Sequence, residues 1–293
     1  MRVAFRLVDV FTDQPLAGNQ LCVFPGPTGL PADLMQAVAK EIGFSETTFI
    51  TEASGDRYEM RIFTPGTELA FAGHPSLGTA FVLVAEGRVT NPVTQSVAAG
   101  EFPLVVDLAA RSARMRQLAP AFGTRVDDRA AVAAAVGLDA DDLRDDPPAQ
   151  MVSTGLGHLT VPARHAEAVA RARPDAAALA ELLAPLGTDG YYLFAVEDDG
   201  PDGARAKARF FGTGIGIVED PATGSAAGPV GAYAVRYGLI SSNRLTISQG
   251  EELGRPSTLF VEVERDGDDP AQWRVFVGGG VAIVGEGSFD LDA

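Results

Sequence analysis

The chain has 293 residues, 46% of them hydrophobic, with 39 acidic and 23 basic side chains and a formal net charge of −16. This length allows one large domain or two ordinary ones. The negative field repels phosphate backbones and anionic lipid, which argues against nucleic acid and membrane as partners, but a small anion bound by local donors is not excluded.

The first part of the chain predicts short strands and two helices. One helix is expected over Pro31–Ile42, where apolar residues recur at helical spacing after a proline start. A second helix should open at His74 or Pro75 and run to about Glu86. The β-branched and aromatic runs predict strands at Val3–Val10, Gln20–Phe24, Thr47–Thr51, Tyr58–Phe63, Phe102–Asp107 and Arg114–Leu118.

A stretch rich in Ala and Asp, Asp127–Asp145, marks the connection to the second part of the chain. Helices are predicted there at Arg129–Val136, Arg164–Arg171, Asp175–Leu183 and from Ser225 to about Tyr237, which Gly238 follows as a stop. Strands are predicted at Gln150–Ser153, His158–Val161, Gly190–Val196, Ala206–Phe211, Arg244–Ser248, Ser257–Val263, Gln272–Val277 and Val281–Phe289.

Two stretches repeat one pattern of strand, Glu-containing loop and Gly-polar helix start. They are RIFTPGTELAFAGHPSLGTAF from Arg61 and RFFGTGIGIVEDPATGSAAGPVGA from Arg209. A three-residue insertion after Phe211 aligns Glu68 with Glu219, Gly73 with Gly224, and His74 with Ser225. The repeat predicts two related halves, 1–118 and 119–293, and leaves open whether the final strand near 281–293 returns to the first half.

Strands outnumber helices and short turns join most of them, which favours an α+β fold in which two pseudo-repeated halves each wrap a strongly curved, mostly antiparallel sheet around a central helix. A doubly wound nucleotide-binding sheet is disfavoured, since the glycines of Gly212–Gly216 have the wrong spacing. Two helix N-termini facing each other across a cleft between the halves could hold a small anion. The active site is expected in that cleft.

Motifs along nearly the whole chain support a more specific interpretation. They read VDVFTDQPLAGNQ, GFSETTF, FTPGTELAFAGHPSLGTA, VEDPATGSAAGP and SQGEELGRPS. Together they resemble the phenazine-biosynthesis PhzF-like isomerase family of the diaminopimelate-epimerase fold group. The resemblance implies an isomerase, and it implies a homodimer.

The resemblance also assigns roles to individual residues. Glu46 matches the general acid/base carboxylate of the family, while His74 and Asp220 match positions that assist proton movement and orient the substrate. Ser225, with the backbone of Gly73 and Gly224, matches the contacts to the substrate carboxylate. Ser45 lies in the matching Ser-Glu-Thr context, and Asn19 matches a pocket asparagine.

The residues agree with these roles on physical grounds. A carboxylate buried near Phe44 and Phe49 would have its pKa raised toward neutrality, as moving a proton between carbons requires. Each residue could instead have a purely structural role. Glu46 could be a surface carboxylate or a helix cap, His74 could hydrogen-bond backbone groups at a helix N-terminus, and Asp220 could cap the helix that begins at Ser225.

The remaining candidates narrow the chemistry. Epimerases and racemases of the wider fold group carry a cysteine before each Gly-polar pair, where this chain has Ala72 and Thr223, so two-thiol racemisation is excluded. Cys22 is expected to be a buried hydrophobic residue, and a single cysteine suits a cytoplasmic protein.

No run of the sequence approaches the roughly 18 apolar residues of a membrane span. Of the histidines, His158 reads as a strand residue without a visible partner and His165 as a solvated helix start, which gives no metal site.

The sequence therefore predicts a cofactor-independent isomerase that moves a proton between carbons of a small carboxylate-bearing metabolite, with neither metal nor cofactor. The alternative is a non-catalytic anion-binding or scaffold protein with the same fold. A hydrolase with Asp220 or Ser225 as nucleophile lacks a Gly-X-Ser-X-Gly elbow and a histidine placed by local signature to activate the serine.

Overall fold

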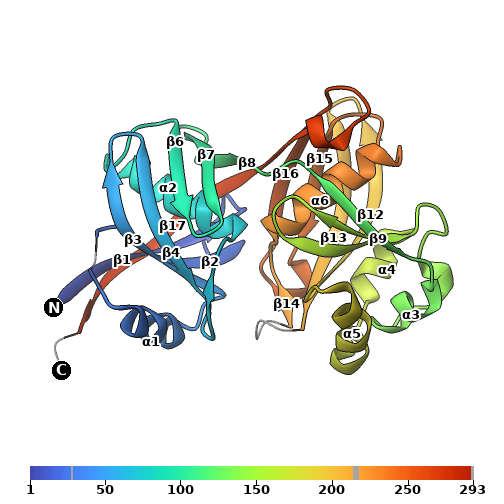
Figure 1. Ribbon diagram of the computed structural model, residues 1–293, viewed down its shortest axis with the longest axis horizontal. Helices are drawn as coiled ribbons and strands as arrows, with labels where there is room; N and C mark the ends of the chain where they lie inside the picture. The colour runs from blue at the N-terminus through green and yellow to red at the C-terminus, as the bar shows by residue number, and fades with distance from the viewer. Residues whose placement is uncertain (28, 214–217, 292–293) are drawn as a thin grey trace. The chain divides into compact units, whose positions relative to one another are not determined.

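A computed structural model describes residues 1–27, 29–213 and 218–291 (Figure 1). The contacts divide the chain into two units, a first unit of residues 1–116 and 278–293 and a second unit of residues 117–277. Of the glycines in Gly212–Gly216, whose spacing disfavoured a nucleotide-binding sheet, Gly214 and Gly216 lie outside the described residues.

The sheet of the first unit closes on itself around one helix. Its elements are β1 (Arg2–Val10), β2 (Asn19–Phe24), α1 (Ala32–Ile42), β3 (Glu46–Ser54), β4 (Arg57–Phe63), β5 (Glu68–Leu69), α2 (Gly73–Ala85), β6 (Val93–Val97), β7 (Gly100–Asp107), β8 (Ser112–Arg116) and the C-terminal part of β17 (Arg274–Asp290). The pairing runs β1, β2, β3, β4, β6, β7, β8 and returns to β1 through β17. Helix α2 is buried along almost its whole length and contacts six of these strands.

Helix α1 buries a single face on the first unit's sheet, as its apolar spacing predicts. It contacts β3 and β4. Its buried residues Met35, Val38 and Ala39 join an aromatic cluster in which the rings of Phe24 and Phe49 stack at 4.7 Å.

The second unit repeats this strand order around helix α6. Its elements are β9 (Ala121–Val126), α3 (Arg129–Ala134), η1 (Ala140–Asp142), β10 (Ala149–Ser153), β11 (Gly157–Pro162), α4 (Ala166–Arg171), α5 (Ala176–Leu183), η2 (Ala184–Leu186), β12 (Gly190–Gly200), β13 (Gly203–Gly212), β14 (Glu219–Asp220), α6 (Gly224–Arg236), β15 (Arg244–Gln249), η3 (Glu251–Leu253), β16 (Ser257–Glu264), η4 (Pro270–Gln272) and the first residues of β17. Helix α6 is as buried as α2 and contacts β10, β11, β15 and β16.

The registers show that the two units are copies of one pattern. Strands β2 and β3 pair in parallel, as do β11 and β12, and β4 with β6 matches β13 with β15. Phe63 pairs with both Thr47 and Glu68, just as Phe211 pairs with Tyr191 and Glu219. The predicted α+β class with pseudo-repeated, mostly antiparallel halves is confirmed.

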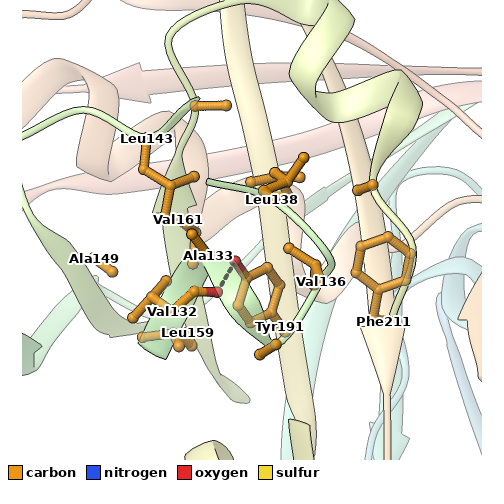
Figure 2. Packing of buried hydrophobic residues seen from close by; sticks show 14 of the residues in the cluster. Val132, Ala133, Val136, Leu138, Leu143, Ala149, Leu159, Val161, Tyr191 and Phe211 are labelled. Atoms are coloured by element: carbon orange, nitrogen blue, oxygen red, sulfur yellow. Dashed lines mark hydrogen bonds between the residues drawn. The ribbon is translucent and has the colours of Figure 1, made fainter. Parts of the chain in front are cut away.

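A second core covers the outer face of the second unit's sheet (Figure 2). Residues of α3, α4 and α5 pack there against β11 and β12, and the Tyr191 hydroxyl donates a 2.9 Å hydrogen bond to the carbonyl of Val132. Because this bond satisfies the one polar atom of the ring, the tyrosine can be fully buried among aliphatic side chains.

The end of the chain differs from the sequence-based expectation. Strands were predicted separately at Gln272–Val277 and Val281–Phe289, but β17 continues from Arg274 to Asp290 through Gly278–Gly280. A Cβ on Gly278 would lie 2.7 Å from the carbonyl oxygen of Ala113, and one on Gly280 would lie 2.6 Å from that of Thr12. The glycines therefore permit close approach of neighbouring backbones within a strand. Strands β6 and β9 were also missed.

An ion pair recurs at the same place in each unit but in different surroundings. Arg61 forms two 2.7 Å hydrogen bonds to exposed Glu68. Its counterpart Arg209 is buried, binds Glu219 at 2.7 and 2.8 Å, and donates to three carbonyls around the end of α4, including that of Ala172 at 2.8 Å.

The repeat therefore supplies a matched pair of variants. Arg209→Met strands a largely buried carboxylate and three carbonyls, so it should lower the free energy of unfolding by roughly 3–5 kcal/mol. Arg61→Met removes an exposed pair and should cost about 1 kcal/mol or less. Urea unfolding of both variants measures the difference, and equal losses would contradict this account of the buried pair.

Candidate active site

In the first unit, Glu46 and His74 bring a carboxylate and an imidazole together. Glu46 opens β3 and pairs with Leu21 of β2, while His74 is the second residue of α2. Nε2 of His74 lies 3.3 Å from Oε2 of Glu46, and both residues are buried. A site that can exchange a proton is thus formed where a strand and a buried helix begin.

The His74 ring is held by a chain of polar groups. The Ser45 hydroxyl donates to Oδ1 of Asn19 at 3.0 Å, and Nδ2 of Asn19 lies 3.3 Å from Nδ1 of His74. Because an amide nitrogen can only donate, Nδ1 accepts and the proton of a neutral ring is on Nε2. Nε2 also lies 3.3 Å from the carbonyl oxygen of Gln20. In this tautomer the Nε2–H can donate to the carbonyl oxygen of Gln20, and Nε2 also lies beside Oε2 of Glu46.

The Glu46 carboxylate is poorly compensated for its burial. Burial raises the pKa of Glu46 to about 7, and the Ser45 hydroxyl lowers that pKa to a lesser extent. Oε2 of Glu46 has no hydrogen bond among the described residues, since the His74 contact has the distance of an ion pair without hydrogen-bond geometry. Both protonation states are accessible near pH 7, which suits a general acid/base.

In the second unit, Asp220 is tied to the start of α6. Its Oδ2 accepts a 2.5 Å hydrogen bond from the hydroxyl of Thr223, and its carbonyl oxygen accepts one from Nε2 of Gln249 at 2.8 Å. Gln249 also accepts from the backbone N–H of Thr223 and from the hydroxyl of buried Tyr192. Asp220 thereby fixes the residue that precedes the Gly-polar pair.

The first turns of α2 and α6 expose backbone donors. Neither Ala72 nor Thr223 caps its helix with a side chain, and the N–H groups of Gly73, Gly224 and Ser225 have no acceptor within the described part of the chain. Each helix start therefore has the unsatisfied donors and the partial positive charge that attract an anion.

One residue in this region was not recognised from the sequence. His158 was expected to be a strand residue without a partner, but its Nε2 lies 3.1 Å from the hydroxyl oxygen of Ser225. No local motif joins residues 67 positions apart. The repeat could have indicated this contact. His158 lies on β11, which corresponds to β2, and β2 lies beside the start of α2, so β11 is expected beside the start of α6.

A serine beside a histidine raises the hydrolase alternative again. Burial lowers the pKa of His158 to about 4, and its Nδ1 has no hydrogen-bond partner among the described residues. The ring is a weak base without the orienting carboxylate of a catalytic triad. This geometry does not favour Ser225 as a nucleophile.

The predicted site residues fall into one group in each unit. Asn19, Ser45, Glu46, Gly73 and His74 gather in the first unit, and Asp220, Gly224 and Ser225 gather in the second. The described residues include no group of three or more His, Cys, Asp or Glu side chains placed to hold a metal ion. No helix in the described part of the chain is long and apolar enough to cross a membrane.

Comparison with known proteins places this arrangement in a family. The model of the phenazine biosynthesis-like proteins matches residues 8–287. Trans-2,3-dihydro-3-hydroxyanthranilate isomerase of Pseudomonas fluorescens is 32% identical over 97% of this chain and 98% of the relative. The uncharacterized isomerase YfhB of Bacillus subtilis is 30% identical over 88% of this chain and 90% of its own length.

Solved structures agree with the sequence relatives. The PhzF-family phenazine biosynthesis protein of Bacillus anthracis superposes with a TM-score of 0.88 at 26% identity, covering 99% of this chain and all of that one. A predicted epimerase of Pseudomonas aeruginosa gives 0.84 at 36% identity with the same coverage. A probable proline racemase of Agrobacterium radiobacter shares the fold alone, with a TM-score of 0.64 at 14% identity over 99% of this chain and 93% of that one.

The fold and these relatives define the chain as an isomerase with the diaminopimelate-epimerase type of architecture. It belongs to the phenazine biosynthesis-like family, as the resemblance of its motifs implied.

The raised pKa of Glu46 makes stability depend on pH. A folded-state pKa near 7 means that the folded protein binds this proton more tightly than the unfolded chain, so the contribution is complete below about pH 4.5 and is lost as the pH rises to about 7. Glu46→Gln lacks this loss. Relative to wild type, it should gain roughly 2–3 kcal/mol of unfolding free energy between pH 5 and pH 8.

Urea unfolding at the two pH values measures this gain. The matched control is Glu52→Gln, which changes an exposed carboxylate of the same strand. A pH-independent difference between Glu46→Gln and wild type would show that Glu46 ionises normally in the fold.

Proposed function

We propose that this isomerase needs no cofactor and moves a proton between two carbons of a small, unsaturated, carboxylate-bearing metabolite, with Glu46 as general acid/base. The observation that carries the proposal is the buried Glu46 carboxyl, whose pKa lies near 7 and whose Oε2 has no hydrogen-bond partner among the described residues. A binding protein would not need a carboxyl in this condition.

The proposed steps balance within the substrate and one side chain. Ionised Glu46 removes a proton from a carbon next to a double bond, and the C–H electron pair shifts that bond along the skeleton. The protonated carboxyl then returns the proton to the far carbon, so that substrate and product are isomers. Positioned proton transfer of this kind contributes roughly 10²–10⁴ in rate.

His74 and Asp220 have supporting roles in the proposal. Nε2 of His74 lies 3.3 Å from Oε2 of Glu46, so a positive charge on this ring would stabilise the carboxylate form, while Asn19 and Ser45 hold the ring in place. Asp220 fixes Thr223 and thereby the start of α6. Both orient the reacting groups.

We propose that the substrate carboxylate binds to the first turns of both central helices, through the backbone of Gly73 and Gly224 and the hydroxyl of Ser225. The uncapped donors of both helix starts support this role. A crystal structure with anthranilate should show its carboxylate on the N–H groups of both glycines. Binding at one helix start alone would reject the shared site.

The named relatives suggest where to seek the substrate. One is trans-2,3-dihydro-3-hydroxyanthranilate isomerase, which matches almost the full length of this chain. We propose that the substrate is trans-2,3-dihydro-3-hydroxyanthranilate, a cyclic amino-carboxylate, or a metabolite of the same class. We also propose that the protein acts in the cytoplasm.

The chemical step has a direct test. Glu46→Gln keeps the shape of the side chain but cannot carry a proton at neutral pH, so it should bind anthranilate like wild type and lose at least about 10²-fold in kcat. Turnover of trans-2,3-dihydro-3-hydroxyanthranilate, and then of related cyclic carboxylates, measures the effect, with Glu52→Gln as the control.

The outcomes separate the alternatives. Near-normal kcat in Glu46→Gln would move the chemistry to His74 or Asp220. Activity that EDTA abolishes would contradict the cofactor-independent mechanism. Carboxylate binding without turnover of any tested substrate by wild type would favour the non-catalytic alternative.

We also propose that the protein is a homodimer, as the family resemblance implies. Light scattering at micromolar concentration should return twice the chain mass of 30.5 kDa. A monomer mass that persists as the concentration is raised tenfold would contradict the dimer.

A further inference from the structure

His158 and Gly190 replace, in the second unit, the pair that Leu21 and Glu46 form in the first. Leu21 and Glu46 pair on neighbouring parallel strands one residue before the pair Cys22 and Thr47. His158 and Gly190 lie one residue before Leu159 and Tyr191, the pair that corresponds to Cys22 and Thr47. In both units a titratable side chain from this strand pair contacts the second residue of the central helix, Glu46 at His74 and His158 at Ser225. In the second unit that side chain comes from the other strand.

Gly190 makes this exchange possible. A Cβ at position 190 would lie 2.3 Å from Nδ1 of His158 and 2.8 Å from Cε2 of Phe210. Any other residue would push the imidazole away, so the absence of a side chain at Gly190 leaves the space that the His158 ring occupies.

The surroundings of His158 decide which nitrogen carries the proton. The ring is buried and its pKa is about 4, so at neutral pH it is uncharged and has one N–H. Nδ1 has no hydrogen-bond partner among the described residues, and the ring of Phe210 stands at 90° to the imidazole with the ring centroids 5.4 Å apart. A proton on Nδ1 would be stranded, whereas a proton on Nε2 has Ser225.

We propose that His158 is a positioning residue: it donates from Nε2 to the hydroxyl oxygen of Ser225 and thereby leaves the hydroxyl hydrogen to be donated to the carboxylate of the substrate. Ser225 is only partly buried, and its hydroxyl has no other hydrogen bond in the described part of the chain. If the ring accepted instead, Ser225 would donate its only hydroxyl hydrogen to His158. Only the lone pairs of its oxygen would then face an anion, which they would repel.

This inference rests on the proposed carboxylate-binding role of Ser225, but not on turnover. Its first test is ¹⁵N NMR of histidine-labelled protein at pH 7, with the His158 signals assigned by loss in His158→Gln. The proton should be on Nε2. A proton on Nδ1 would overturn the proposal whatever the enzyme's substrate.

The second test measures anthranilate binding by calorimetry. Ser225→Ala should weaken binding about tenfold, the effect of one hydrogen bond to a charged group. His158→Leu, which installs the residue found at Leu21, should weaken binding about fivefold. His158→Gln keeps a donor and should stay within about twofold of wild type. His165→Leu, at an exposed histidine, is the control.

The double variant separates positioning from a general structural effect. Because His158 acts through Ser225, His158→Leu should add nothing in the Ser225→Ala background. Gly190→Ala should match His158→Leu, since it displaces the same ring. The proposal would be overturned if the affinity loss of the double variant equalled the product of the two single losses. It would also be overturned if His158→Leu bound anthranilate as tightly as wild type. If wild type does not bind anthranilate, the ¹⁵N result decides.

Discussion

A helix that is apolar on every side must be enclosed by other elements, and this constraint organises both units. Helices α2 and α6 are buried along almost their whole length, which is possible only if strands surround them. In the first unit the sheet closes completely, with β17 joining β1 to β8. Enclosure also buries the first turns of the helices, so their backbone donors need a partner other than bulk water. The same packing that stabilises each unit thus leaves the backbone donors that the proposed carboxylate site would use.

The two copies share one framework but carry different side chains at their helix starts. Phe63 and Phe211 occupy the same register, and the Arg–Glu pairs beside them are retained. The helix starts differ, since a carboxylate lies beside an imidazole in one unit and an imidazole lies beside a hydroxyl in the other. Burial raises the pKa of Glu46 and lowers that of His158, so the charged form of each is disfavoured. One group is left able to exchange a proton at neutral pH and the other is held neutral.

Much of the fold could be predicted from the sequence because its signals are local. The apolar spacing after Pro31 predicted α1, and the Gly-polar pairs predicted the starts of α2 and α6 within one or two residues. The repeat also aligned Glu68 with Glu219 correctly. The continuity of β17 through Gly278–Gly280 was not predicted, because the close approach of neighbouring backbones that favours these glycines is a tertiary feature. The contact of His158 with Ser225 was missed for a related reason. Tertiary packing brings the two residues together, and no local sequence pattern around either one indicates the other.

The proposed chemistry depends on burial keeping the Glu46 carboxyl between its acid and base forms at neutral pH. The most direct measurement is a ¹³C NMR titration of the side-chain carboxyl carbons of glutamate-labelled protein, with the Glu46 signal identified by its loss in Glu46→Gln. The account predicts a midpoint for Glu46 near pH 7. A midpoint near 4.5, the ordinary value for a glutamate, would contradict it.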